Sequence, residues 1–341
     1  MKKLLLVLSL LIVAGISSLA TLIFCFVESE NKKTHPIEKF KNEFSEFKDL
    51  TPRDRIKPLS NSKVIEYFNR DSINNIVPLE ELTKQETSTL NKLYQAIELW
   101  PLIYKDYLWD KVARIYIVDG LFSSGMARYI EKGNAHFILI NRKLLSLKPN
   151  DWATQTEESC FYYNNLSDRL FVEIEQKTDS YLTLENVLIH ELGHVIAIDE
   201  EITPDYIPRK LGGNYPFFKD AFYSDINKMH RKPNNKIINL TYYARQKDKV
   251  TFDDYYNLSK ELKNTDYPTI YGISNQDEYF AEYFYLFFHC NIQGKNFRAY
   301  YHKNGLKELL IDNPLTKERC FDRIMLLINE LHKLNYTQQS L

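Results

Sequence analysis

One stretch of the chain, Thr183–Ile198, constrains the fold more than any other. Its apolar residues recur at helical spacing, which predicts a mostly buried α-helix. The helix carries the pattern H-E-x-x-H, with His190, Glu191 and His194. Residues four positions apart on a helix are neighbours, so the two imidazoles project side by side. Gly193 lies inside the helix, where glycine costs about 1 kcal/mol relative to alanine, and this favours a close approach by another element.

The H-E-x-x-H pattern predicts a catalytic zinc site that holds one Zn²⁺ per chain. Neutral imidazoles bind zinc at about 2.0–2.1 Å, so His190 and His194 can share one ion. Glu191 lies next to the first of these ligands and can take a proton from a metal-bound water. Two protein ligands leave a catalytic zinc site incomplete, and the rest of the chain must supply a third.

The third metal ligand is expected outside this helix. The longer pattern H-E-x-x-H-x-x-G-x-x-H fails, because Ala197 and Glu200 occupy its later positions. A second stretch, Tyr271–Glu282, contains Glu278 and Glu282, which are four apart and share one helix face. Zinc would satisfy Glu278, and a ring N–H of a ligand histidine would satisfy Glu282. Spacing alone leaves open an ordinary amphipathic helix on which both carboxylates face solvent.

The two stretches together resemble the catalytic domain of the anthrax toxin lethal factor family and the related bacterial Pro-Pro endopeptidases. Both groups are zincin metallopeptidases, and the resemblance covers about residues 110–340. It implies that His190, His194 and Glu278 are the zinc ligands and that Glu191 is the general base. It also implies that Tyr271 donates a hydrogen bond to the developing oxyanion. The gap between the two stretches is longer than expected for that family, which predicts an insertion at about residues 200–265.

The expected fold class is α+β and mostly helical, with a small mixed sheet packed on the zinc helix and a later helix that carries the glutamate ligand. Two strands are predicted before the zinc helix, at Val112–Val118 and Ala135–Asn141, with a loop or hairpin at Gly125–Gly133 between them. Helical patterns are predicted at residues 62–68, 83–104, 217–230, 251–262, 274–289 and 320–334.

The strand Ala135–Asn141 is the predicted substrate-binding edge. A protease of this type holds its peptide substrate extended, and an exposed sheet edge does so through main-chain hydrogen bonds. We therefore expect His136, Phe137 and Ile138 to contact the substrate. An interior strand that is paired on both sides is an alternative with nearly equal support.

Residues 1–27 form a separate segment. Two lysines precede an uncharged apolar run, Leu4–Val27, which is long enough to cross a bilayer as a helix. The run predicts a membrane partner through an uncleaved signal anchor, with a cleaved signal peptide as the second choice. The rest of the chain is then expected on the extracellular side of a bacterial cell membrane, or secreted. Residues 28–60 are predicted to be a stalk with an amphipathic helix, and 61–341 to be the peptidase domain.

The expected function is a zinc-dependent metalloendopeptidase that hydrolyses peptide bonds in an extracellular or cell-surface protein. The net charge is −1, with acids and bases interspersed, which excludes a nucleic-acid-binding footprint. Two alternatives stay open: a non-catalytic cell-surface binding module, and a secreted toxin-like protease that acts on a host protein. The intact Glu191 argues against the first. One disulfide among Cys160, Cys290 and Cys320 also stays open.

Overall fold

The computed structural model of the chain describes residues 47–70, 74–131, 135–175, 183–203, 216–218, 242–243, 249–262, 265–316 and 320–339. All of them belong to one unit of the chain, Phe47–Leu341. Most of the predicted insertion at 200–265 lies outside the described residues, as does most of the helix predicted at 217–230.

The structure corrects the prediction that the protein is anchored in a membrane or lies outside the cell. Among the described ranges, no helix has the length and apolar character needed to span a bilayer. The run 1–27, on which the anchor was predicted, lies outside those ranges. The expectation of an anchored or extracellular protein is therefore withdrawn.

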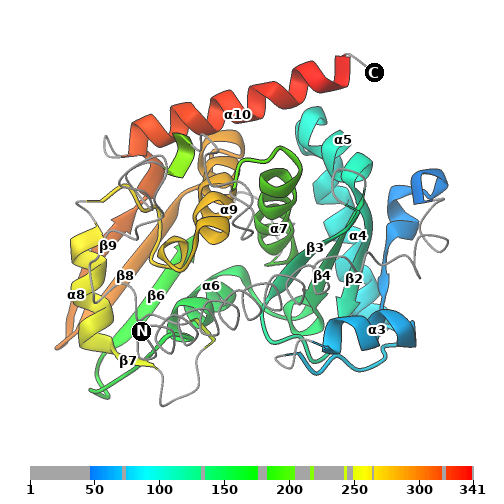
Figure 1. The fold of residues 1–341 in the computed structure, drawn as a ribbon. Helices are drawn as coiled ribbons and strands as arrows, with labels where there is room; N and C mark the ends of the chain where they lie inside the picture. Colours follow the sequence, from blue (N-terminus) through cyan, green and yellow to red (C-terminus); the bar gives the residue numbers. More distant parts are fainter. Residues whose placement is uncertain are drawn as a thin grey trace, which may run out of the picture. The chain divides into compact units, whose positions relative to one another are not determined.

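A four-stranded mixed sheet lies beside the predicted zinc helix (Figure 1). Its strands are β1 (Ile56–Pro58), β2 (Val112–Val118), β3 (Gly125–Glu131) and β4 (Ala135–Asn141), in the order β1-β2-β4-β3. The first three in this order are parallel, and β3 runs antiparallel to β4. Strands β2 and β4 are buried along their whole length, as expected for parallel strands covered on both faces. The α+β class and the small mixed sheet are thus confirmed.

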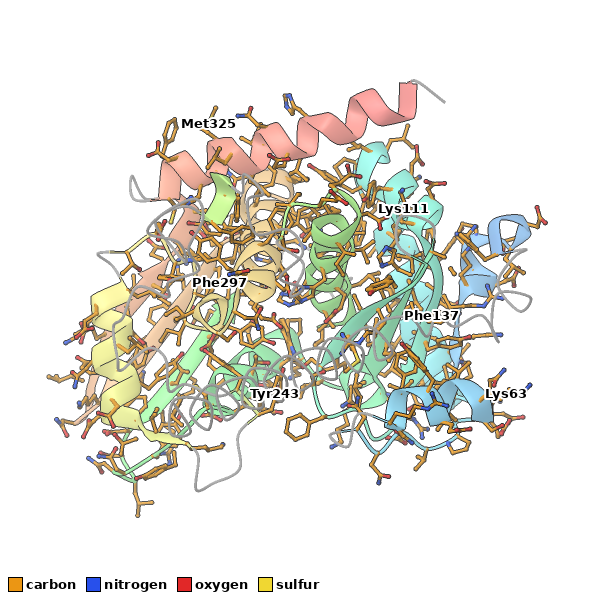
Figure 2. The ribbon with its side chains drawn as sticks, in the orientation of Figure 1. Lys63, Lys111, Phe137, Tyr243, Phe297 and Met325 are labelled. Carbon is orange, nitrogen blue, oxygen red and sulfur yellow. The ribbon has the colours of Figure 1, made fainter. Side chains whose placement is uncertain are left out.

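The prediction that Ala135–Asn141 is a substrate edge is wrong. Strand β4 is interior: Ile138 pairs with Ile115 of β2 on one side and with Ala127 of β3 on the other. The segment Gly125–Gly133, which was expected to be a loop or hairpin, contains strand β3, and β3 lies at the edge of the sheet beside β4. His136 and Ile138 are fully buried, and Phe137 (Figure 2) packs against aromatic rings, those of Phe68 and Tyr116.

The predicted stalk ends earlier than residue 60, because the folded unit begins at Phe47. Strand β1 adds to the edge of the sheet, and the N–H of Leu59 donates to the carbonyl of Ile117 at 3.1 Å. The buried guanidinium of Arg55 donates to the carbonyl of Val112 at 3.3 Å. Residues 47–60 are therefore part of the domain, and 28–46 lie outside the described residues.

Helices α3 (Ser62–Asn69), α4 (Lys84–Glu98) and α5 (Leu102–Lys111) lie near the four-stranded sheet (Figure 1). The helix predicted over 83–104 is two helices, because Pro101 cannot continue the first and instead precedes the second. A capping box starts α4, with the Thr83 hydroxyl and the Glu86 carboxylate each accepting from the other's backbone N–H.

A second, three-stranded antiparallel sheet was not predicted. It consists of β6 (Arg169–Ile174), β8 (Phe297–Lys303) and β9 (Leu306–Asp312), with β8 in the centre. Helix α6 (Pro149–Glu158), also not predicted, packs on β6. Two short strands, Phe161–Tyr162 and Val250–Thr251, pair in parallel, and the second leads into α8 (Phe252–Leu262).

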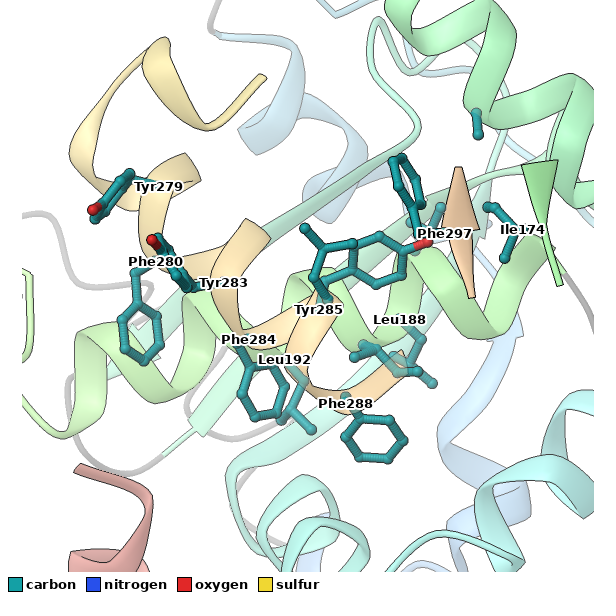
Figure 3. Packing of buried hydrophobic residues seen from close by; sticks show 14 of the residues in the cluster. Ile174, Leu188, Leu192, Tyr279, Phe280, Tyr283, Phe284, Tyr285, Phe288 and Phe297 are labelled. Carbon is teal, nitrogen blue, oxygen red and sulfur yellow. The ribbon is translucent and has the colours of Figure 1, made fainter. Parts of the chain in front are cut away.

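The core is centred on α7 (Thr183–Asp199) and α9 (Gln276–Leu286), which lie side by side (Figure 1). Helix α9 continues as a π-helical stretch, Phe287–Ile292, and α10 (Phe321–Gln339) follows the second sheet. Figure 3 shows the aromatic side chains that α9 contributes to this core. No disulfide joins Cys160, Cys290 and Cys320 to one another, so the possible disulfide among them is absent.

Candidate metal centre

Gly193 allows α7 and α9 to approach closely, as the glycine inside the predicted helix suggested. A Cβ atom at this position would lie 3.0 Å from the Cα of Ala281 and 3.3 Å from the Cδ1 of Phe284. Contacts this short are tighter than side chains normally make, so a larger residue would push the helices apart. This contact lies one turn from Glu278 on α9 and beside His194 on α7.

The close approach brings the three predicted metal ligands together. One ligand atom each from His190, His194 and Glu278 lies within 4.8 Å of the others. The Oε2 atom of Glu278 is 3.0 Å from Nε2 of His190 and 3.5 Å from Nε2 of His194. Ligand atoms about 2.0–2.1 Å from a tetrahedral zinc ion lie about 3.3 Å apart, so these distances fit one shared ion. Two imidazoles and a carboxylate form the donor set of many catalytic zinc sites.

The electrostatics of the three side chains favour a bound cation. Burial alone would raise the pKa of Glu278, but the neighbouring His194 and His190 lower it well below its usual range. Burial likewise opposes protonation of His190, yet Glu278 and Glu282 raise its pKa well above the ordinary value. The negative potential that attracts a proton to these imidazoles would also attract a divalent metal ion.

Glu282 supports the first histidine, as predicted. Its Oε1 atom lies 3.0 Å from Nδ1 of His190, which leaves Nε2 of that ring to face Glu278. The other oxygen of Glu282 accepts from the Thr269 hydroxyl at 2.7 Å, and that hydroxyl accepts from the N–H of Gly272 at 3.0 Å. This series of hydrogen bonds fixes the ring and ties the segment around residue 271 to it. No motif or spacing in the sequence pointed to Thr269.

Glu191, the predicted general base, is buried beside the three candidate metal ligands. It is 5% exposed, and its Oε2 atom is buried with no hydrogen-bond partner in the described part of the chain. Burial raises the pKa of Glu191, while His194 and His190 oppose the rise. A Cβ atom on Gly125 of β3 would lie 2.5 Å from Oε1 of Glu191, so the outer strand passes directly beside this carboxylate. A buried, unpartnered acceptor beside a metal centre is suited to a water molecule bound there.

Tyr271 lies close to the metal ligands, in the short 3₁₀ turn that precedes α9. Its ring centroid is 5.8 Å from that of His190 and 4.5 Å from that of Tyr242. Burial and the charge of Glu278 raise the pKa of Tyr271 well above the usual value, so its hydroxyl keeps its proton and acts as a donor.

His136, by contrast, lies away from this centre. Its Nε2 atom is 2.7 Å from Oδ1 of Asp199, at the end of α7, so the contact joins β4 to the zinc helix. His136, Phe137 and Ile138 are therefore core residues, and the prediction that they bind substrate is wrong.

A cavity opens beside Glu191 and Tyr271. Its described lining comes from β3, α6, α7, α9 and their neighbours and consists of Ser123, Ser124, Gly125, Trp152, Ala153, Thr156, Glu157, Val187, His190, Glu191, Tyr243, Tyr271, Glu282, Tyr285 and Phe297. The contributions from α6 were missed, because the polar stretch after residue 151 shows little periodicity in sequence.

Comparisons with models of known protein families, with curated proteins and with solved structures found no match. The resemblance to the lethal factor family therefore stays a prediction, and the geometry of the site carries the functional argument.

Proposed function

We propose that the protein is a zinc-dependent metalloendopeptidase of the zincin type. The observation that carries the proposal is the convergence of His190, His194 and Glu278 beside the buried, unpartnered carboxylate of Glu191. A zinc ion held by the three ligands would supply Lewis acidity, which lowers the pKa of bound water and polarises a scissile carbonyl. A binding module that used the metal only for structure would have no use for Glu191, whose burial without a partner is costly.

The chain's own residues account for the remaining steps. Glu191 accepts the proton of the attacking water and returns it to the leaving amine. The Tyr271 hydroxyl donates a hydrogen bond to the carbonyl oxygen as negative charge develops on it. Glu282 holds His190 in the orientation that keeps Nε2 available as a ligand atom.

The substrate is proposed to lie along β3, the outermost strand of the described sheet on the side of Glu191. The N–H of Asn141 donates to the carbonyl of Ser124, which makes these two residues a hydrogen-bonded pair. Such pairs alternate along an antiparallel ladder. The peptide groups of Met126 and Arg128 therefore face β4, whereas that of Ala127 faces outward, where an extended peptide can pair with it.

Proline substitutions on β3 separate substrate binding from folding. Ala127→Pro removes an outward N–H, so it should raise KM several-fold with a small change in melting temperature. Arg128→Pro removes an N–H that faces β4 and should destabilise the domain more than Ala127→Pro does. Peptide hydrolysis and thermal melts of the two variants provide the measurement. Equal loss of stability in both would place β3 inside a larger sheet.

Tyr271→Phe should keep the fold and the metal but lower kcat by about 100- to 1,000-fold, the effect of one oxyanion donor. KM should change little, because the hydroxyl acts on charge that develops only in the transition state. Tyr107→Phe is the matched control, since its hydroxyl donates to Glu200 at 3.0 Å, outside the cavity. An unchanged kcat in Tyr271→Phe would remove this residue from the mechanism.

The proposed function is tested with an unbiased peptide mixture and mass spectrometry. The zinc-loaded protein should cleave internal peptide bonds, and the protein stripped of metal by a chelator should not, until zinc is restored. Cleavage that survives metal removal would contradict a metallopeptidase. Zinc binding without cleavage of any peptide would favour the non-catalytic binding module instead.

A further inference from the structure

The cavity beside Glu191 contains a second carboxylate, that of Glu157, at the C-terminal end of α6. The hydroxyls of Tyr242 and Tyr255 both donate to Oε2 of Glu157, the first at 2.8 Å. No described residue hydrogen-bonds the other oxygen, Oε1, and this atom is not fully buried. One oxygen is therefore held in place, and the other is accessible to an occupant of the cavity.

The lining of the cavity is acidic. Besides Glu157 it includes Glu191 and Glu282, and no lysine or arginine is found among its described residues. Burial raises the pKa of Glu157 to about 7, although the two tyrosine hydroxyls lower it. A cation next to Oε1 would compensate the carboxylate for its lost hydration and keep it ionised.

Much of the remaining lining is apolar. It includes Val187 of α7 and several aromatic residues, of which Tyr285 and Phe297 are labelled in Figure 3. Another of them, Trp152, donates from Nε1 to the Ser124 hydroxyl at 2.9 Å and packs edge-on against Tyr285. Long basic side chains bury their methylene groups along such surfaces while the charged end reaches a polar partner.

We propose that this cavity selects peptide substrates with a lysine or arginine next to the scissile bond, and that Glu157 is the specificity-determining residue. The inference rests on the proposed peptidase function. The ammonium or guanidinium group pairs with Oε1 of Glu157, and the methylene chain lies on the apolar lining. A neutral side chain of the same length fills the same space but leaves the carboxylate without a partner.

Peptides that are identical except at the two positions flanking the scissile bond test this assignment. Lysine, arginine, norleucine or glutamate is placed at each position, and kcat/KM is measured for the zinc-loaded wild type. At one of the two positions, lysine and arginine should exceed norleucine by about 10- to 100-fold, the effect of one hydrogen bond to a charged group. Glutamate should be the poorest substrate, because the lining is acidic.

Glu157→Gln should remove the preference for basic residues, because the amide keeps an acceptor for the tyrosine hydroxyls but has no charge. Its cleavage of the norleucine peptide should rise rather than fall, because that side chain no longer lies beside an uncompensated charge. A thermal melt shows that the variant is folded. Glu158→Gln is the matched control. Glu158 accepts from the Tyr163 hydroxyl and does not line the cavity, so the preference should remain.

Binding provides a readout that does not depend on hydrolysis. The amides of Nα-acetyl-lysine and Nα-acetyl-norleucine are titrated into the three proteins and followed by NMR. The lysine compound should bind more tightly to the wild type and to Glu158→Gln, but not to Glu157→Gln. If no peptide is cleaved but this pattern is found, the peptidase proposal fails and cation recognition by Glu157 stands. Equal cleavage of lysine and norleucine peptides, or equal binding by Glu157→Gln, overturns the specificity assignment.

Discussion

Glu191→Gln is expected to retain zinc and to lose peptide hydrolysis by about 10²- to 10⁴-fold in kcat, the contribution of a positioned general base. The amide has nearly the shape of the carboxylate but cannot accept the proton of the attacking water. The metal ligands are untouched, so zinc content and melting temperature should stay close to those of the wild type. The measurement is kcat on one cleaved peptide, together with metal analysis of the same sample.

Glu200→Gln is the control for this substitution. Glu200 follows the end of α7 and accepts from the Tyr107 hydroxyl at 3.0 Å, outside the cavity. Its replacement should leave kcat unchanged. Turnover by Glu191→Gln at the wild-type rate would mean that another group removes the proton, and the mechanism proposed for this site would be wrong.

Glu278→Ala is expected to lower zinc affinity by more than about 100-fold. Loss of a residue that merely supports a ligand costs about 10- to 100-fold in affinity, and Glu278 is proposed to be a ligand itself. Competition with a chromophoric zinc chelator measures the change. Asp277→Ala is the control, because Asp277 is the neighbouring acid in the same helical turn and is not among the three clustered ligands.

Removal of Glu278 also leaves His190 and His194 without the carboxylate that both approach. Circular dichroism should therefore accompany the zinc titration, and Glu278→Gln, which keeps the size of the side chain, provides a second variant. A zinc affinity within a few-fold of the wild type in both variants would remove Glu278 from the ligand set.

Helix α7 could be predicted from sequence because its signals are local. The 3.6-residue periodicity of α7 and the four-residue spacing of His190 and His194 both lie within one element. The position of Gly193 also indicated a close contact, and Ala281 proved to be the partner. Glu278, which is 88 positions from His190, could be assigned only through the resemblance to a family, since spacing alone left two interpretations open.

The order of the strands could not be read from sequence. The pattern of Ala135–Asn141 shows an apolar strand, but whether a strand lies at an edge depends on which neighbour pairs with it. The glycine at position 125 suggested a loop, whereas it allows β3 to pass beside Glu191 without a clash. A strand buried on both faces also loses the alternation of apolar and polar residues, so its pattern carries no further positional signal.

The proposed role of Glu157 in substrate selection could not be predicted from sequence for a similar reason. The residue lies in a polar stretch that shows no motif, and its two hydroxyl partners are 85 and 98 positions away. Only the fold brings Tyr242, Tyr255 and the cavity lining to the same carboxylate. Thr269 is comparable, since its hydroxyl acquires a role only when Glu282 is placed against His190.

The most direct measurement of the central claim is a stepwise zinc titration of the metal-free protein during hydrolysis of one cleaved peptide. The account predicts no turnover without metal, a linear rise with added zinc, and a plateau at one zinc per chain. Glu191→Gln should take up the same amount of zinc and show no comparable rise. Turnover in the metal-free protein, or a rate that does not follow zinc occupancy, would contradict the claim that His190, His194 and Glu278 form a hydrolytic zinc centre.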